Sequence, residues 1–146
     1  MPTTPSGLIV IGPLTEVTTE LKTDADPDAP KIGDYGTYQD DLIDADGNKI
    51  GEVFGRAEAV YIRPSDGHSF AWYIEDITLP DGTASYEGPL DTTLARTGTP
   101  VRVPIVGTGG RYAGLLGTRE VTIVNSKLYV DVKFVFFPEI QADERP

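Results

Sequence analysis

The 146-residue chain has no cysteine, and its single histidine is His68. The lack of cysteine excludes disulfide bonds, thiol nucleophiles and cysteine-ligated metal sites. His68 directly follows an Asp-Gly turn, and we interpret it as an exposed turn residue. One histidine in that position argues against Ser-His and Cys-His catalysis and against a histidine-rich metal site.

Basic residues are scarce: 12 Lys and Arg stand against 23 Asp and Glu, which gives a formal net charge of −11. A surface of this sign repels a phosphate backbone, so we expect no nucleic-acid partner. The simplest consequence of the charge is solubility. An acidic surface also offers no long-range attraction to an anionic ligand, which would have to be held by local contacts in a pocket.

Long hydrophobic runs are also missing. The longest run near the start covers residues 8–11 and ends at Gly12-Pro13, far short of a membrane span. No basic segment precedes it, so we expect no signal peptide, no anchor and no membrane partner. The absence of cysteine is typical of a cytoplasmic protein.

Glycine and proline, by contrast, are abundant, with 16 and 12 residues. They form turn signals at a spacing of roughly 8–12 residues, which is typical of a sandwich or barrel. Two examples are the sequences at residues 64–67 (PSDG) and 80–82 (PDG). No stretch has a clear helical period. We therefore predict an all-β domain of about eight strands, and eight strands can enclose one small ligand.

The turn signals also predict the limits of the domain. We assign residues 15–138 to the β-domain, residues 1–14 to a flexible N-terminal arm or lid, and residues 139–146 to a C-terminal tail. Within the domain, a strand is predicted over residues 83–94. The glycine-rich residues 107–117 are predicted to form a wide turn that closes the barrel.

The last predicted strand alternates most clearly. One face carries an apolar set that we place in the interior: Leu128, Val130, Val132, Phe134 and Phe136. The other face, which includes Tyr129, is mixed, and we place it toward solvent or a subunit partner.

Three loops look superficially like ligand sites. The acidic patterns at residues 24–28 (DADPD) and 44–48 (DADGN) lack the glycine and glutamate that an EF-hand requires at later positions. The sequence at residues 107–111 (GTGGR) lacks the lysine of a phosphate-binding loop. We interpret all three as ordinary turns and predict no metal site.

Aromatic and charged residues remain as candidates for a pocket. An inward tyrosine would bring a hydroxyl into a dry space, where a ligand carbonyl can accept its hydrogen bond. Glu16 and Arg119 lie in segments that otherwise look buried. They either face inward and pair with each other, or they both face solvent.

Three segments carry a further signal: residues 61–67 (YIRPSDG), 73–82 (YIEDITLPDG) and 109–117 (GGRYAGLLG). They resemble the spirotetronate cyclases, the natural Diels–Alderases of polyketide pathways such as that of abyssomicin, and the resemblance covers about residues 15–124. It implies a single eight-stranded antiparallel barrel of the allene oxide cyclase type with an internal ligand pocket. It also implies a homodimer that acts without a cofactor.

The activity that the resemblance implies is an intramolecular (4+2) Diels–Alder cycloaddition. The substrate would be a linear polyketide that ends in a tetronate or tetramate ring. An exocyclic methylene on the ring is the dienophile and a diene in the chain is its partner, and the product is a spiro-fused cyclohexene.

Site residues also follow from the resemblance. Tyr73 corresponds to a tyrosine that donates to the ring carbonyl, and Tyr38 to a pocket aromatic. Glu16 and Arg119 correspond to an ion pair that closes one barrel end. At three pocket positions this chain has a smaller residue than a spirotetronate cyclase to which it is similar: Thr92, Val103 and Val121. These three residues, together with Tyr38 and Ile123, are the ones predicted to bind substrate.

Two alternatives stay open on the sequence alone. One is a hetero-Diels–Alder or ring-rearranging tetronate cyclase on the same barrel. The other is a non-catalytic, lipocalin-like carrier of apolar molecules, which would release its ligand unchanged.

Overall fold

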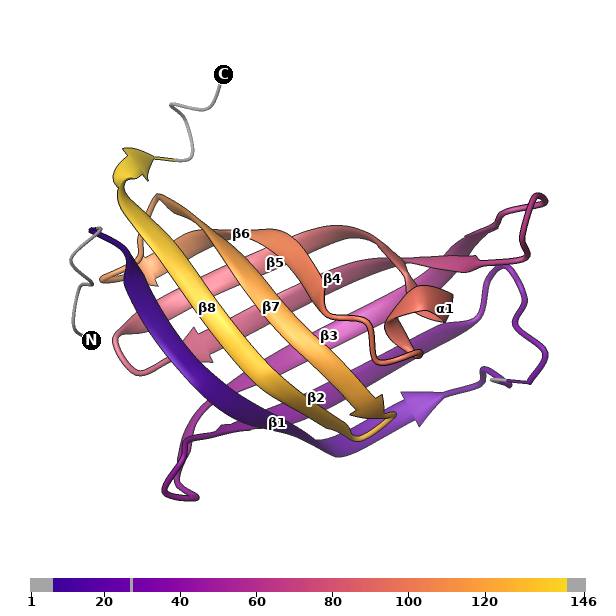
Figure 1. Cartoon of the computed structure of the whole chain (residues 1–146), viewed down its shortest axis with the longest axis horizontal. Coiled ribbons are helices and arrows are strands. Elements are labelled where there is room, and N and C mark those ends of the chain that lie inside the picture. Colours follow the sequence, from indigo (N-terminus) through magenta and orange to yellow (C-terminus); the bar gives the residue numbers. More distant parts are fainter. Residues whose placement is uncertain (1–6, 27, 142–146) are drawn as a thin grey trace.

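The computed structural model describes residues 7–26 and 28–141, and these form a closed barrel of eight antiparallel strands. Each strand pairs with the next, and the last pairs with the first (Figure 1). The elements are β1 (Ile9–Thr23), β2 (Tyr35–Ile43), β3 (Lys49–Ile62), β4 (Ser69–Leu79), β5 (Gly82–Asp91), α1 (Thr92–Ala95), β6 (Val101–Gly110), β7 (Leu115–Asn125) and β8 (Leu128–Gln141). The predicted eight-stranded antiparallel barrel is confirmed. No helix within the described residues has the length and apolar character to cross a membrane.

The ends of the barrel differ from the predicted boundaries. β1 begins at Ile9, so residues 9–14 of the predicted arm are strand, and Ile9, Ile11 and Leu14 are buried. β8 ends at Gln141, three residues into the predicted tail. Residues 1–6 and 142–146, which complete the predicted arm and tail, lie outside the described residues.

Two local predictions were wrong. The strand predicted over residues 83–94 ends at Asp91, whose carboxylate accepts the N–H of Leu94 at 2.9 Å and caps α1. A helix of four residues is too short for its period to stand out in the sequence. Within the predicted wide turn at residues 107–117, residues 107–110 belong to β6 and pair with β5, residues 115–117 belong to β7, and a tight turn joins them. Gly107 permits this because a Cβ there would collide with the backbone of Tyr112.

A bulge in β8 changes which of its residues face inward. Val132, Phe134 and Phe136 are fully buried, as predicted. Asp131, however, has a φ of 52°, and the pairing of β8 with β7 shifts register beside it. The shift turns the Tyr129 side chain into the barrel, so its predicted outward placement was wrong.

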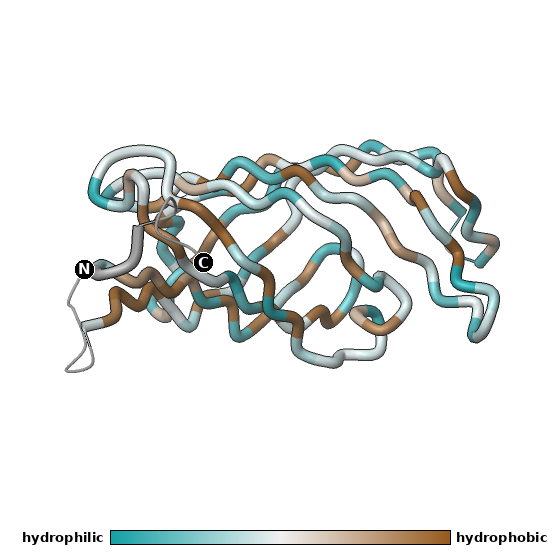
Figure 2. Tube along the Cα trace, turned by 90° about the horizontal axis from the view of Figure 1, so that it is seen from above, coloured by the Kyte–Doolittle hydropathy of each residue, from teal (hydrophilic) through white to brown (hydrophobic). Residues whose placement is uncertain are grey.

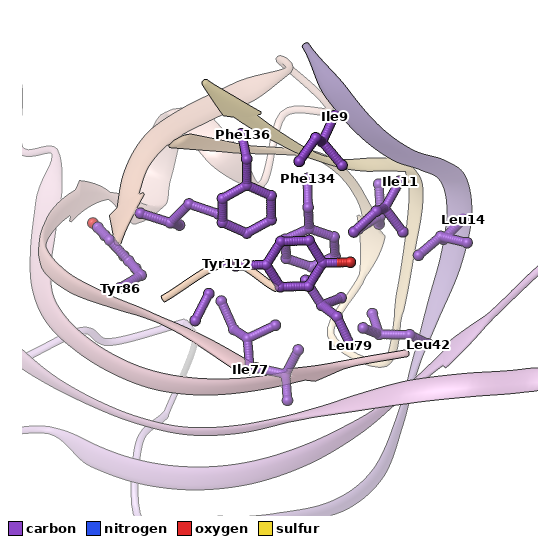
Figure 3. Packing of buried hydrophobic residues seen from close by; sticks show 14 of the residues in the cluster. Ile9, Ile11, Leu14, Leu42, Ile77, Leu79, Tyr86, Tyr112, Phe134 and Phe136 are labelled. Carbon is purple, nitrogen blue, oxygen red and sulfur yellow. The ribbon is translucent and has the colours of Figure 1, made fainter. Parts of the chain in front are cut away.

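One half of the barrel is filled with apolar side chains. This apolar cluster comprises Ile9, Ile11, Leu14, Leu42, Val53, Ile77, Leu79, Ala84, Tyr86, Ile105, Tyr112, Leu115, Val132, Phe134 and Phe136. Figure 3 shows Tyr112 at its centre, and its ring stacks on Phe136 with centroids 4.4 Å apart. Hydropathy changes rapidly along most strands (Figure 2), because alternate residues face the interior and the solvent.

Candidate functional site

The other half of the barrel holds a cavity of about 530 Å³. This volume lies in the range of small-molecule binding sites. Its walls come from the ends of six strands and from α1, and it opens beside residues 25–26, 30–34 and 124–126. The space exists because small side chains face inward here: Ala57, Ala59 and Ala71 line it.

Four buried ionisable residues separate the cavity from the apolar cluster. We call them the charged belt: Glu16, Asp40, Glu75 and Arg119 are 0%, 0%, 5% and 4% exposed. Each occupies an inward position on its strand between cluster and cavity residues. On β4, for example, Glu75 lies between Ile77 of the cluster and Tyr73 of the cavity. The barrel is therefore closed beneath the cavity.

Arg119 holds the belt together. Its Nη2 donates to Glu16 Oε2 at 2.9 Å, and its Nε donates to Glu75 Oε1 at 2.9 Å. The structure thus brings Glu16 and Arg119 together and adds a second carboxylate to the pair. Burial of both side chains excludes the alternative in which they face solvent. The pair lies between the cluster and the cavity, whereas the resemblance placed it at a barrel end.

The belt holds three carboxyl groups and one guanidinium, so full ionisation would leave buried negative charge uncompensated. Burial raises the pKa of Glu16 to about 8; Arg119 opposes the rise and Asp40 adds to it. Neither Glu16 Oε1 nor the Asp40 carboxylate has a hydrogen-bond partner among the described residues. We infer that a proton on Glu16 Oε1 supplies the donor that the two groups lack.

Tyr38 connects the belt to the cavity. Its hydroxyl donates to Glu75 Oε2 at 2.5 Å, which places the ring over Gly55, where a Cβ would collide with it. The ring meets Tyr73 edge-on, with centroids 6.5 Å apart. Burial raises the pKa of the Tyr38 hydroxyl, and the adjacent Glu75 carboxylate raises it further.

Two other tyrosines present free hydroxyls to the cavity. Tyr73 and Tyr129 both line it, and neither hydroxyl forms a hydrogen bond with any described residue. Burial raises the pKa of Tyr73 to about 12, with a further contribution from Glu75 and an opposing one from Arg96. Burial also raises the pKa of Tyr129. Both phenols are therefore neutral hydrogen-bond donors at pH 7.

Of the residues predicted to bind substrate, the structure places Tyr38, Thr92 and Ile123 on the cavity together with Tyr73. The Thr92 hydroxyl is already engaged, because it donates to the carbonyl of Ser69 at 2.9 Å. Val103 and Val121 are not among the residues that line the cavity. They pack against the apolar cluster instead.

Several site residues escaped the sequence analysis. Glu75 and Asp40 continue the inward alternation of Tyr73 and Tyr38, so strand period alone could have indicated them. Tyr129 was assigned to the wrong face because the bulge at Asp131 reverses the pattern. Arg96 was missed because it was placed in a turn after the strand predicted over residues 83–94, and the helical turn that brings it to the cavity was not foreseen.

Two acidic residues lie at the opening of the cavity. Asp26 and Asp34 line it on one side, and each accepts a backbone N–H from its own loop, at 2.9 and 2.8 Å. The acidic sequence at residues 44–48, the second pattern that looked like a calcium loop, forms a local turn in which Asp44 Oδ1 accepts the N–H groups of Asp46 and Asn48. No group of three or more potential metal ligands occurs within residues 7–26 and 28–141.

His68 is more enclosed than its turn position suggested. Its side chain is 27% exposed, and its Nδ1 lies 2.7 Å from Asp91 Oδ2. Because Asp91 also caps α1, the contact ties the β3–β4 turn to that helix. His68 itself does not line the cavity.

Comparison with known proteins places this architecture among related barrels. The family described as "Allene oxide cyclase barrel like domain" matches residues 15–136. A search of curated proteins gave no match.

Among solved structures, the chain is similar to the Diels-Alderase AbmU from Streptomyces koyangensis, with a TM-score of 0.80 and 35% identity over 90% of this chain. It is also similar to a nonspecific heme-binding cyclase that catalyzes (4+2) cycloaddition during neoabyssomicin biosynthesis, with a TM-score of 0.79 and 35% identity over 88% of this chain. A third similar structure is AbnU, an exo-specific intermolecular Diels-Alderase, with a TM-score of 0.79 and 28% identity over 88% of this chain. The chain spans 64%, 63% and 96% of these three proteins, respectively.

Proposed function

The chain belongs to the allene oxide cyclase barrel-like family, and we propose that it is a cyclase that catalyses an intramolecular (4+2) cycloaddition of a linear polyketide. The observation that carries the proposal is the one-ended cavity with the unpartnered Tyr73 hydroxyl at its base. The similar structures support it, since their names describe Diels-Alderases and a (4+2) cyclase.

The proposed substrate carries a tetronate or tetramate ring with an exocyclic methylene at one end and a diene in its chain. In the reaction six π electrons reorganise: two carbon–carbon σ bonds form, and three π bonds become one. No atom enters or leaves, and no proton is transferred. The reaction therefore requires neither a nucleophile nor a general base from the protein.

The barrier is lowered chiefly by holding the two ends of one molecule at bonding distance. In well-oriented intramolecular reactions this effect reaches about 7–11 kcal/mol. The small residues Ala57, Ala59 and Ala71 provide the room, and the walls around them restrict the chain to folded conformations. Shape is thus the main contribution of the cavity.

Tyr73 supplies orientation and polarisation. As a neutral phenol with no protein acceptor, it can donate to the ring carbonyl and withdraw electron density from the dienophile. Loss of one such hydrogen bond costs about 1–3 kcal/mol. We expect Tyr38 to contribute less directly, because its hydroxyl is already bonded to Glu75.

The decisive experiment is incubation of the purified protein with a synthetic linear tetronate that bears both reacting groups. We expect a product of unchanged mass, separated by chromatography, at a rate well above the uncatalysed reaction. Tyr73→Phe should reduce kcat/KM about tenfold or more, in line with loss of one buried hydrogen bond. Tyr61→Phe, on an exposed tyrosine outside the cavity, is the matched control and should leave the rate unchanged.

Other outcomes separate the alternatives. Tight binding with no acceleration would identify a carrier. A product formed faster from separate diene and dienophile molecules would indicate an intermolecular reaction, and a product with an oxygen-containing new ring would indicate a hetero-cycloaddition. The homodimer and the cytoplasmic location stay predictions from the sequence.

A further inference from the structure

Arg96 brings a positive charge to the wall of the cavity. It is the residue that ends α1, where its N–H donates to the Thr92 carbonyl at 3.1 Å. No other lysine or arginine occurs among the described residues that line the cavity. No ion pair joins the Arg96 guanidinium to a described carboxylate. The helix thus fixes the backbone of Arg96 at the cavity wall, and its exposed guanidinium is available to a ligand.

The positive charge of Arg96 also acts on Tyr73, the residue proposed to orient the substrate ring. Arg96 is the group that opposes the rise in the pKa of Tyr73, so the guanidinium and this phenol lie within electrostatic range of each other. The two side chains approach the cavity from different places, Arg96 from the end of α1 and Tyr73 from β4, and both can donate hydrogen bonds.

The surroundings of Arg96 would otherwise oppose an anion. The protein has a net charge of −11, and Asp26 and Asp34 line the opening. An acyl tetronate or tetramate is a vinylogous carboxylic acid, whose ring proton is acidified by three conjugated carbonyl groups. Such a ring is an enolate anion at neutral pH, so it needs a local cation to enter this cavity.

We propose that Arg96 binds the enolate oxygens of the substrate ring, while the Tyr73 hydroxyl donates to the neighbouring ring carbonyl. This inference rests on the proposed function, since it assumes an acyl tetronate or tetramate ring. The planar guanidinium matches two adjacent oxygens and can donate to both. Pairing the enolate with a cation also reduces the electron density that the ring places on the dienophile.

Binding of small ring probes tests the inference without requiring turnover. The probes are 3-acetyl tetronic acid, which is anionic, and its neutral O-methyl enol ether, both titrated by NMR at pH 7. Wild-type protein should bind the anion more tightly than the ether. Arg96→Gln should weaken binding of the anion about tenfold, the cost of one charge-assisted hydrogen bond, and leave the ether unchanged.

Two variants serve as controls. Arg96→Lys keeps the charge but loses the fork of donors, so it should retain part of the preference for the anion. Arg102→Gln removes an arginine of the outer surface that pairs with Glu120, and it should change neither affinity. Added salt should narrow the difference between wild type and Arg96→Gln, because screening weakens exposed charges.

Several results would overturn the inference. These are equal affinities of the wild type for both probes, no binding of either probe, or an Arg96→Gln variant that keeps the preference for the anion. Failure of the proposed function is distinct, because it would show as wild-type protein that binds the anion but does not convert the linear tetronate.

Discussion

The two halves of the barrel have different interiors, although six of the eight strands contribute to both. On β3 and β4, Val53 lies opposite Ile77 in the apolar cluster, whereas Ala59 lies opposite Ala71 at the cavity. The backbone pairing is the same in both places, and only the volume of the inward side chains differs. On these two strands, therefore, the size of the inward residues decides whether the interior is packed or open. Stability should therefore reside in one half and binding in the other.

The sharpest test compares one large residue from each half. Phe134→Ala should lower the free energy of unfolding by about 3–5 kcal/mol, because Phe134 is fully buried in the apolar cluster. Ile123→Ala should lower it by less than about 1.5 kcal/mol, because Ile123 borders the open cavity. Urea denaturation at fixed pH measures both. Equal losses would show that the two halves contribute equally to stability.

The belt between the halves should make stability depend on pH. The pKa of Glu16 is raised to about 8 in the folded state, so the folded protein holds this proton more tightly than the unfolded chain. Its stabilising contribution is complete below the unfolded pKa near 4.5 and is lost as the pH rises toward 8. The free energy of unfolding should fall by about 1.4 kcal/mol for each pH unit, or about 3 kcal/mol between pH 5.5 and 7.5.

Glu16→Gln isolates this contribution. The amide can accept from Arg119 and donate to Asp40 as the protonated acid does, but it does not titrate. The variant should lose most of the slope, whereas Glu20→Gln, an exposed position on the same strand, should keep it. Denaturation series at several pH values give the slopes, and identical slopes in wild type and Glu16→Gln would rule out Glu16 as their source.

The smallest expected changes come from adding volume to each half. Ala84→Phe crowds the apolar cluster and should cost about 1–3 kcal/mol of stability. Ala71→Phe extends into free space, so its cost should stay below about 1 kcal/mol. Only Ala71→Phe should abolish binding of a ring probe. A stable Ala71→Phe variant that binds as the wild type does would mean that the ligand lies elsewhere.

Strand alternation and turn signals correctly predicted an all-β domain of about eight strands, because both follow from local chemistry, and the resemblance added the closed antiparallel barrel. The resemblance to the spirotetronate cyclases is confirmed by the family match and the similar Diels-Alderase structures. It assigned roles to Tyr73 and Tyr38, which line the cavity in the structure. The roles themselves stay predictions.

Two features that the sequence did not reveal, the inward Tyr129 and the position of Arg96, each depend on one local irregularity of the backbone. Tyr129 faces inward because Asp131 adopts a positive φ, and nothing in an alternating strand marks where a bulge will fall. Arg96 reaches the cavity because four residues after β5 form a helical turn. Val103 and Val121 were carried over by position from a relative, yet they pack against the cluster here.

Among the described residues, the charged belt and the apolar cluster close the barrel on one side of the cavity, so a ligand has to enter and leave on the side of Pro30, Asp34 and residues 124–126. If the proposed function holds, substrate and product share this route, and a bound product excludes the next substrate. The consequence is that the product should act as a competitive inhibitor.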